Sequence, residues 1–395
     1  MKKTCLFLAS LLCFFSSFAQ NIQFTLLQSS DQEVVIRVDF PDFSTRSVMV
    51  DNQQMSLLTM SEAYPINEVG NPQLLQTATS LMIPENSAPS VEILHSSFHI
   101  VNGFELAPSK GTLYRNINPQ DIPYQKGPAY LQDKMFYNDS VTLGDSYQLH
   151  DYHGIPVRFY PFAYNPVRKE LKVYSSITVR IRFNSTSDIQ HPSRVSKTFK
   201  DIYQNHFLNY RTMRSTPLEE NGAILILAPQ EFCEAMQPYA EWKIKNGYPT
   251  EIVSLSTIGN TSSQVKTYIT NYYNSHNLTF VLLVGDSGKF PTITANGNIS
   301  DNYYGEIAGN DCYADVIIGK ISAETVDHVN TQVDRFIQYE QNPPETSHFP
   351  VFCGIASSQG PGDNNEHDYE HIRNIDNLLQ SYTYTSGYEF FEGSH

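Results

Sequence analysis

Cysteine is scarce in this sequence. Five cysteines occur in 395 residues, and two of them, Cys5 and Cys13, lie near the N-terminus. The other three, Cys233, Cys312 and Cys353, are too few and too scattered for a disulfide framework or a cysteine-based zinc site. The sequence therefore excludes a small scaffold held by disulfides and a structural zinc module.

Basic residues are also few. The chain has 26 Lys and Arg against 41 Asp and Glu, which gives a net charge of -15. Phosphate binding needs clustered cations, so this balance argues against a nucleic-acid partner, whereas an acidic surface suits calcium-rich surroundings. The 25 Tyr and 23 Phe are more than a disordered chain carries and favour well-packed, strand-rich domains.

Only one long apolar run is present, and it lies at the N-terminus. Lys2 and Lys3 precede the apolar stretch 4–18, and Ala19 ends a small-x-small cleavage pattern. This arrangement is typical of a secretory signal peptide, and the run is shorter than the roughly 20 residues that a membrane span needs. We therefore predict that residues 1–19 are a signal peptide, that the mature protein is secreted or displayed at the cell surface, and that it has no membrane span.

Two regions with different hydrophobic periods follow the signal peptide. Residues 20–214 contain short alternating runs separated by Pro, Gly and Asn, such as Glu33–Asp39, Val91–Leu94 and Leu171–Phe183. This pattern predicts a β-sandwich-like domain and no sustained helix before Phe199. Residues 215–395 instead alternate apolar strands with helices, which predicts an α/β domain with a mostly parallel sheet.

The expected elements of the second region can be placed along the sequence. We expect helices at 230–246, after an N-cap at Ser322 and at 371–379, with Val326, Val329, Val333 and Phe336 on one face of the second helix. We expect strands at 223–228, 250–254, 279–284, 315–318 and 351–356.

A polar segment joins the two regions. Residues 210–222 contain Arg211, Arg214 and a proline that prevents a continuous helix. Such a segment is accessible to proteases, and cleavage between Arg214 and Ser215 would separate the two domains. An ordinary interdomain hinge is the alternative interpretation.

Acidic residues follow predicted strands in the second region. Asp286 comes directly after the strand at 279–284, and Asp311 and Asp315 are four residues apart in the loop before the next strand. We expect these three carboxylates at one edge of the sheet, where their oxygens suit Ca²⁺. The alternative is a turn whose aspartates accept hydrogen bonds from the backbone nearby.

A second polar loop follows the strand at 351–356. It carries Glu366, His367, Asp368 and His371, which we expect at the same sheet edge as Asp286. Cys312 and Cys353 have apolar strand residues as neighbours, which predicts buried and unreactive thiols.

Several of these segments together resemble one known family. The runs Leu282–Asp286, Gly305–Gly319 and Ile355–Ser357, followed by Asp363 and the stretch Glu366–His371, resemble the gingipain family of secreted bacterial cysteine peptidases in order and spacing. The resemblance covers about 214–384 and implies a caspase-like α/β fold. It also implies that residues 20–214 are an inhibitory prodomain that covers the active site until it is cleaved.

The resemblance further implies ligands and a specificity residue. It implies a structural calcium ion held by Asp286, Asp311, Asp315 and the carbonyl groups of Ala308 and Tyr313, and a second one near Glu366 and His371. Asp368 corresponds to the carboxylate that pairs with the guanidinium of a P1 arginine. A carboxylate provides the bidentate partner that arginine prefers over lysine.

The same resemblance places the catalytic His and Cys beyond residue 395. We therefore expect the chain to be the front part of a cysteine endopeptidase zymogen that acts on protein or peptide substrates, inactive as it stands. Two alternatives stay open: a non-catalytic, calcium-stabilised surface or binding protein with the same fold, and a family member that processes secreted surface proteins.

Overall fold

The computed structural model describes residues 21–114, 116–210, 217–295, 297–343, 349–361 and 366–393. The predicted signal peptide and the predicted cleavage site at Arg214 and Ser215 lie outside the described residues. Within these residues, no helix is both long and apolar enough to span a membrane.

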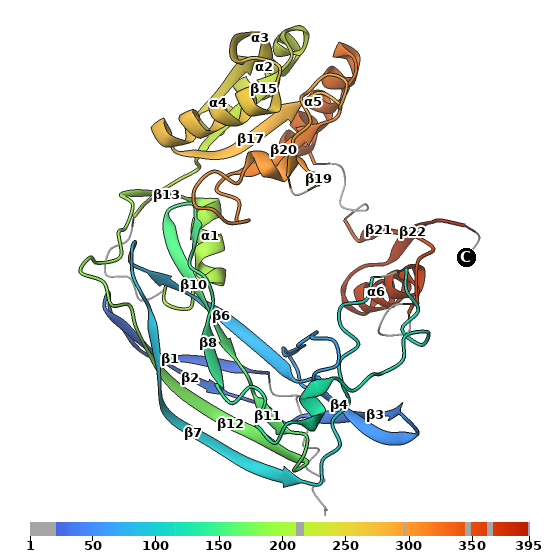
Figure 1. The fold of residues 1–395 in the computed structure, drawn as a ribbon. Coiled ribbons are helices and arrows are strands. Elements are labelled where there is room, and N and C mark those ends of the chain that lie inside the picture. The colour runs from blue at the N-terminus through green and yellow to red at the C-terminus, as the bar shows by residue number, and fades with distance from the viewer. Residues whose placement is uncertain are drawn as a thin grey trace, which may run out of the picture.

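The first half of the chain forms two five-stranded antiparallel sheets that face each other (Figure 1). The first sheet has the order β1-β2-β12-β11, with β7 also paired to β12; these strands are Gln23–Ser29, Glu33–Asp39, Glu170–Arg182, Phe162–Asn165 and Ser90–Asn102. The second has the order β5-β6-β10-β8, with β9 also paired to β10; these strands are Tyr64–Pro65, Leu75–Ile83, Tyr152–Phe159, Val141–Leu143 and Tyr147–Leu149. A hairpin of β3 (Ser44–Val50) and β4 (Gln53–Thr59) lies beside them.

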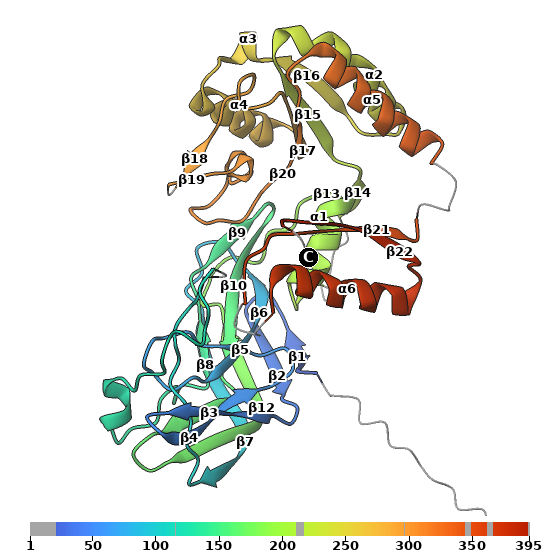
Figure 2. The ribbon, with the colours of Figure 1, turned by 90° about the vertical axis from the view of Figure 1, so that its right-hand side faces the viewer.

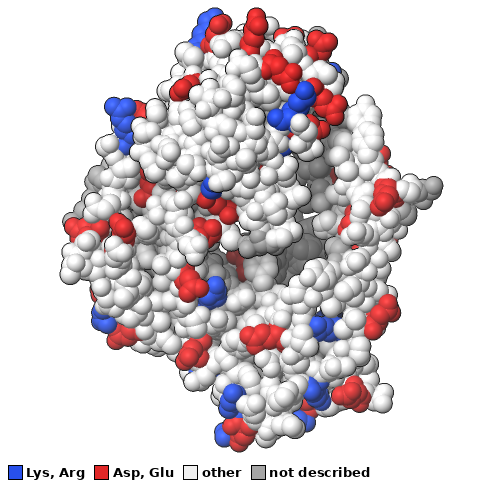
Figure 3. All heavy atoms as spheres, turned by 45° about the horizontal axis from the view of Figure 1, so that its top comes forward, with Lys and Arg blue, Asp and Glu red and all other residues white. Residues whose placement is uncertain are grey.

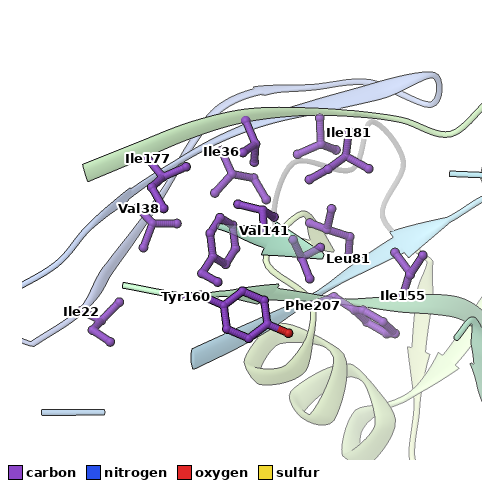
Figure 4. Close-up of a cluster of buried hydrophobic side chains, with 14 of the residues drawn as sticks. Ile22, Ile36, Val38, Leu81, Val141, Ile155, Tyr160, Ile177, Ile181 and Phe207 are labelled. Carbon is purple, nitrogen blue, oxygen red and sulfur yellow. The ribbon is translucent and has the colours of Figure 1, made fainter. Parts of the chain in front are cut away.

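One apolar core fills the space between the two sheets. On β2 the alternate residues Val34, Ile36 and Val38 are fully buried, and Ile177 and Ile181 of β12 join them. Figure 4 shows these side chains meeting Leu81 and Ile155 of the opposite sheet. The period-two pattern therefore predicted the buried face correctly, and the predicted β-sandwich is confirmed.

A helix that the sequence analysis did not predict closes the sandwich. Helix α1 (Lys197–His206) begins after the N-cap Ser196, whose hydroxyl accepts a hydrogen bond from the Phe199 N–H at 3.2 Å. Phe199 and Tyr203 are one helical turn apart and both are buried against the sandwich. The helix has ten residues, so its short apolar period was hidden at the end of a strand-rich region.

The second half contains a four-stranded parallel sheet in the order β16-β15-β17-β20 (Figures 1 and 2). Helices cover both faces, and each face has a separate apolar core. On β15, Ile224 and Ile226 face α2 and α5, whereas Leu225 and Leu227 face α3 and α4. The elements are β15 (Ala223–Ala228), β16 (Thr250–Ser254), β17 (Leu278–Val284), β20 (Ile317–Ile321), α2 (Cys233–Lys245), α3 (Leu255–Ile258), α4 (Ser262–Ser275) and α5 (Val326–Gln341).

Most predicted elements of this region are confirmed, but two helix starts are wrong. The helix expected over 371–379 spans Asp368–Tyr382, so Asp368 and His371 lie in this helix and not in the preceding loop. The helix expected after Ser322 begins at Val326, because the hydroxyl of Thr325 accepts the hydrogen bond from the His328 N–H. Its inner face is also narrower than expected. Val329 and Val333 are buried, whereas Val326 and Phe336 are each 41% exposed.

The last strand predicted for this sheet lies elsewhere. Among the described residues, β21 (Val351–Ala356) pairs with β22 (Ser386–Phe391) alone, in parallel, and α6 (Asp368–Tyr382) lies between the two in the sequence. This local strand-helix-strand unit is drawn apart from the four-stranded sheet in both ribbon views (Figures 1 and 2). β21 and β22 thus form a parallel pair with a helical crossover, and β21 does not extend the larger sheet.

Short elements complete the chain. They are η1 (Pro128–Leu131), η3 (Gln230–Phe232), η4 (Asp301–Tyr304), the parallel pair β13 (Arg194–Ser196) with β14 (Leu218–Glu220), and the hairpin β18 (Thr294–Ala295) with β19 (Asn298–Ile299).

Candidate functional site

The carboxyl ends of three parallel strands surround a cavity of about 490 Å³. Because β15 lies between β16 and β17, the chain changes its winding direction at this point, which is where ligands bind in open α/β sheets. The cavity is lined by Pro229, Gln230, Glu231, Leu255, Ser256, Asn260, Ser287, Gly288, Lys289, Phe290 and Pro291.

Charged, polar and apolar residues all line the cavity. The Lys289 Nζ atom forms an ion pair with Glu231 Oε1 at 2.8 Å, and the neighbouring Phe290 is buried. Cys233 lies in the first turn of the adjoining α2, where its Sγ atom is 3.4 Å from the Pro229 carbonyl oxygen. Burial raises the pKa of the Cys233 thiol, so this cysteine is protonated at neutral pH and is a poor nucleophile. The described cavity lining itself contains no His or Cys.

Asp286 lies at this carboxyl edge, as predicted. It follows β17 after Gly285, whose φ of 121° is a backbone conformation that favours glycine. The Asp286 N–H donates to the Ala323 carbonyl at 3.0 Å, and its Oδ1 atom accepts from the Ser287 N–H at 2.7 Å. Asp286 is therefore the residue directly before the segment 287–291 that lines the cavity.

Asp311 and Asp315 lie at the opposite edge of the sheet, so the prediction that they share an edge with Asp286 is wrong. Strand β20 pairs with β17 through Phe280↔Ile317 and Val284↔Ile321, which places Asp315 level with the first residue of β17. The two ends of this seven-residue strand are about 20 Å apart. The loop carrying both aspartates enters β20 at its amino end, whereas Asp286 leaves β17 at its carboxyl end.

The carboxylates of Asp311 and Asp315 accept hydrogen bonds from the β-sandwich. The Gln148 N–H donates to Asp311 Oδ2, and the His150 N–H donates to Asp315 Oδ1, both at 2.8 Å. Asp315 is fully buried, and its Oδ2 atom also accepts from the N–H groups of Ile307 and Ala308. Burial raises the pKa of Asp315, and the three N–H donors oppose that shift.

This arrangement does not fit a single calcium ion held by the five predicted ligands. Peptide N–H groups present positive charge to the oxygens that a cation would need, and Asp286 is at the other edge of the sheet. No group of three or more His, Cys, Asp and Glu side chains converges as a metal site among the residues that the structure describes. Calcium binding by this chain stays a prediction.

The second predicted group lies in the β21-α6-β22 unit, not at the edge that carries Asp286. Asp368 is the first residue of α6, and its carboxylate accepts a hydrogen bond from the Ser357 hydroxyl. Glu366 Oε2 is 2.9 Å from His371 Nδ1, and Glu366 Oε1 accepts from the Asn374 side chain at 3.0 Å. Glu366 and His371 are therefore brought together as expected, and they bind each other.

Two cysteine predictions are also corrected. Cys312 and Cys353 are exposed free thiols, although both were expected to be buried. Cys353 lies within β21 as predicted, but in the part of the chain that the structure describes β21 pairs with one strand, and three of its six residues are half-buried and only Gly354 is buried.

Residues that the sequence analysis did not select make the contact between the two regions. His150 is buried with a positive φ of 51°, and its ring stacks on Phe199 with 4.1 Å between ring centroids. Tyr273 of α4 donates its hydroxyl to the His150 carbonyl at 3.2 Å. The sequence shows only a polar His-Asp pair between two strands, which indicates a turn and gives no sign of its partner.

The fold and these contacts define a two-domain protein in which a β-sandwich binds the acidic loop of an α/β region. Family models match both parts in the same order: Propeptide_C25 matches residues 16–216 and Peptidase family C25 matches residues 218–392. The chain therefore belongs to peptidase family C25.

Gingipains are among the relatives that the chain resembles. Gingipain R2 of Porphyromonas gingivalis strain W83 is 35% identical over 381 residues, which cover 93% of this chain and 52% of the relative. Lys-gingipain W83 of Porphyromonas gingivalis is 21% identical over 369 residues, which cover 86% of this chain and 21% of the relative. The chain thus spans about half the length of the first of these relatives and less of the second.

Solved structures with similar sequences include the complex of Porphyromonas gingivalis RgpB pro- and mature domains. It is 32% identical, covers 48% of this chain and 98% of its own, and has a TM-score of 0.44. The crystal structure of the Arg-specific cysteine proteinase gingipain R is 34% identical, with 46% and 44% coverage and a TM-score of 0.40. Both TM-scores are below 0.5, so the fold described above is based only on the structure of this chain.

Proposed function

We propose that this chain is part of the precursor of a secreted cysteine endopeptidase, in which the β-sandwich is the inhibitory prodomain. The observation that carries the proposal is the order of the two family matches, with a propeptide model followed directly by a peptidase model. Contacts between the sandwich and the loop of Asp311 and Asp315 support an intramolecular role for the prodomain. Basic and acidic side chains are interspersed on the face in Figure 3, without a large basic patch, which agrees with the expectation that the partner is not a nucleic acid.

We further propose that the complete enzyme cleaves after arginine. The relatives named gingipain R are 33–35% identical to this chain, whereas those named Lys-gingipain are 21% identical. Asp368 supplies a half-buried carboxylate at the start of α6, and a carboxylate is the bidentate partner of a guanidinium. The enzyme could then cleave its own chain after Arg214, with the Arg214 side chain bound in its specificity pocket.

The full-length gene product provides the test. N-terminal sequencing of the mature form should give a start at Ser215, and the mature enzyme should cleave arginyl peptides in preference to lysyl ones. Asp368→Ala should lower kcat/KM for arginyl peptides at least 30-fold, because loss of a buried charge partner costs about 2–5 kcal/mol.

A matched control separates specificity from folding. Asp334→Ala changes an exposed aspartate of α5 and should leave cleavage of both peptides unchanged. An enzyme that cleaves other peptides but ignores arginyl ones would exclude the role of Asp368. A gene product without cysteine peptidase activity would instead favour the alternative of a non-catalytic surface protein.

Calcium remains part of the proposal only as a predicted structural cofactor. The residues of the first predicted ligand set do not fit one ion in this structure, because Asp286 lies at the other edge of the sheet and the carboxylate oxygens of Asp311 and Asp315 accept backbone hydrogen bonds.

A further inference from the structure

The turn between β9 and β10 of the sandwich is bound by two carboxylates of the α/β region. Gln148 and His150 each donate a backbone N–H at 2.8 Å, the first to Asp311 and the second to Asp315. The remaining carboxylate oxygens are also occupied, since Asp311 Oδ1 accepts from the Tyr313 N–H at 2.9 Å and Asp315 Oδ2 accepts from the N–H groups of two loop residues. All four oxygens therefore accept hydrogen bonds from backbone N–H groups.

Side chains hold the same turn from both regions. The ring of Tyr147 stacks on Tyr313 with 4.1 Å between centroids, and the His150 Nδ1–H donates to the Asp315 carbonyl oxygen at 2.7 Å. The Tyr273 hydroxyl donates to the His150 carbonyl. These contacts compensate for the left-handed backbone of His150, a conformation that costs a non-glycine residue free energy.

The geometry favours recognition of the turn over binding of a cation. Hydrogen bonds from N–H groups to an ionised acceptor are about twice as strong as neutral ones, and a fully buried carboxylate such as Asp315 needs such partners. A calcium ion would have to displace the N–H groups from the same oxygens, because it requires six to eight oxygen ligands. The turn and a cation thus compete for one set of atoms.

We propose that Asp311 and Asp315 are the residues by which the α/β region recognises the 147–151 turn of its own β-sandwich, and that this turn and a divalent cation exclude each other at these carboxylates. The inference concerns docking of the two regions, so it stands or falls independently of peptidase activity.

Hydrogen–deuterium exchange on the intact chain tests the recognition. Asp311→Asn keeps the side-chain volume but removes the charge and replaces one acceptor with an NH₂ group. We expect exchange of the segment 147–151 to increase at least tenfold in Asp311→Asn and in Asp315→Asn. Asp286→Asn is the matched control, since Asp286 belongs to the same predicted ligand set but lies at the other sheet edge.

The controls keep the outcome unambiguous. Exchange of β2 and β12 reports folding of the sandwich and should be the same in all variants. If Asp315→Asn does not fold, the half-buried Asp311 still provides the test. Unchanged exchange at 147–151 in Asp311→Asn, or an equal increase in Asp286→Asn, would overturn the recognition role.

A calcium titration of the same intact chain tests the exclusion. Calorimetry measures binding of Ca²⁺, and exchange at 147–151 is followed in parallel. We expect either no binding that depends on Asp311, or binding that releases the turn and increases its exchange. Stoichiometric binding that is lost in Asp311→Asn while 147–151 stays protected would refute the exclusion.

Discussion

The two halves of this chain bury their apolar side chains in different ways. The β-sandwich places one continuous core between two sheets, and Val34, Ile36 and Val38 have no measurable exposure. The α/β half divides its apolar residues between two cores and a separate strand-helix-strand unit. In that unit Ile355 is 72% exposed, Tyr388 65% and Phe390 60%.

The β-sandwich therefore buries most of its apolar surface within itself, whereas the strand-helix-strand unit does not. The central strands β2, β6, β10 and β12 of the sandwich each bury several residues in one core between the two sheets, although the edge strand β7 has no buried residue. The β21-β22 pair has only α6 as a cover among the described residues, and its apolar side chains Ile355, Tyr388 and Phe390 are largely exposed, so this unit buries little apolar surface. The comparison therefore predicts that stability is distributed unevenly along the chain.

Native-state hydrogen exchange should show the largest contrast. We expect amides of β2 and β12 to exchange only on global opening and amides of β21 and β22 to exchange through local opening, with rates that differ by at least about a hundredfold. Mass spectrometry of peptic fragments measures both segments in one experiment. Similar protection in the two segments would break the comparison, because it would mean that β21 and β22 are held as firmly as the sandwich.

A matched pair of substitutions sharpens the same comparison. Ile36→Ala removes a fully buried side chain and should lower the free energy of unfolding by about 2–5 kcal/mol. Ile355→Ala makes the same chemical change at an exposed position and should alter stability by no more than about 0.5 kcal/mol. Denaturant unfolding of both variants checks this, and an equal loss would show that Ile355 is buried in solution.

A smaller effect is expected at the start of α4, within the well-covered part of the α/β half. Thr261 and Gln264 form a capping box, so Thr261→Ala should cost about 1 kcal/mol through loss of the N-cap. Thr267→Ala in the middle of the same helix is the control, since its hydroxyl only returns a hydrogen bond to the Ser263 carbonyl. Thermal melts should rank Thr261→Ala below Thr267→Ala, and the reverse order would refute the cap.

The smallest effect is expected for an ion pair at the edge of the sheet. Lys320 Nζ is 2.9 Å from Asp301 Oδ2, and both side chains are 28% exposed. Lys320→Met should therefore cost at most about 1 kcal/mol, and the loss should shrink in high salt because exposed pairs are screened. A larger, salt-independent loss would mean that β20 depends on this pair more than the packing indicates.

Much of the fold could be predicted from local sequence. Alternation of apolar residues located β2 and β12, and continuous apolar runs located β15 and β17, because burial of one or both faces leaves a direct pattern in the sequence. The start of α5 and the existence of α1 were missed. A single N-cap residue gives a weak signal, and so does an apolar pattern in a helix of only ten residues.

The candidate site was predicted less well than the fold. The sequence located the acidic loops and brought Glu366 and His371 together correctly. It failed to place Asp311 and Asp315 relative to Asp286, because a loop between parallel strands returns the chain from one edge of the sheet to the other. An aspartate near the start of this loop lies at the carboxyl edge of the sheet, and one near its end lies at the amino edge. The edge at which Asp311 and Asp315 lie therefore depends on where β20 begins.

The sequence by itself determined the residue types, the two periods and hence the two kinds of domain, because these follow from interactions between residues close along the chain. Only the tertiary structure decided that Gln148 and His150 meet Asp311 and Asp315, since more than 160 residues separate these partners. It also decided that β21 pairs with β22 and does not join the larger sheet. Contacts between distant residues depend on strand register and on docking of whole domains, and neither leaves a local pattern in the sequence.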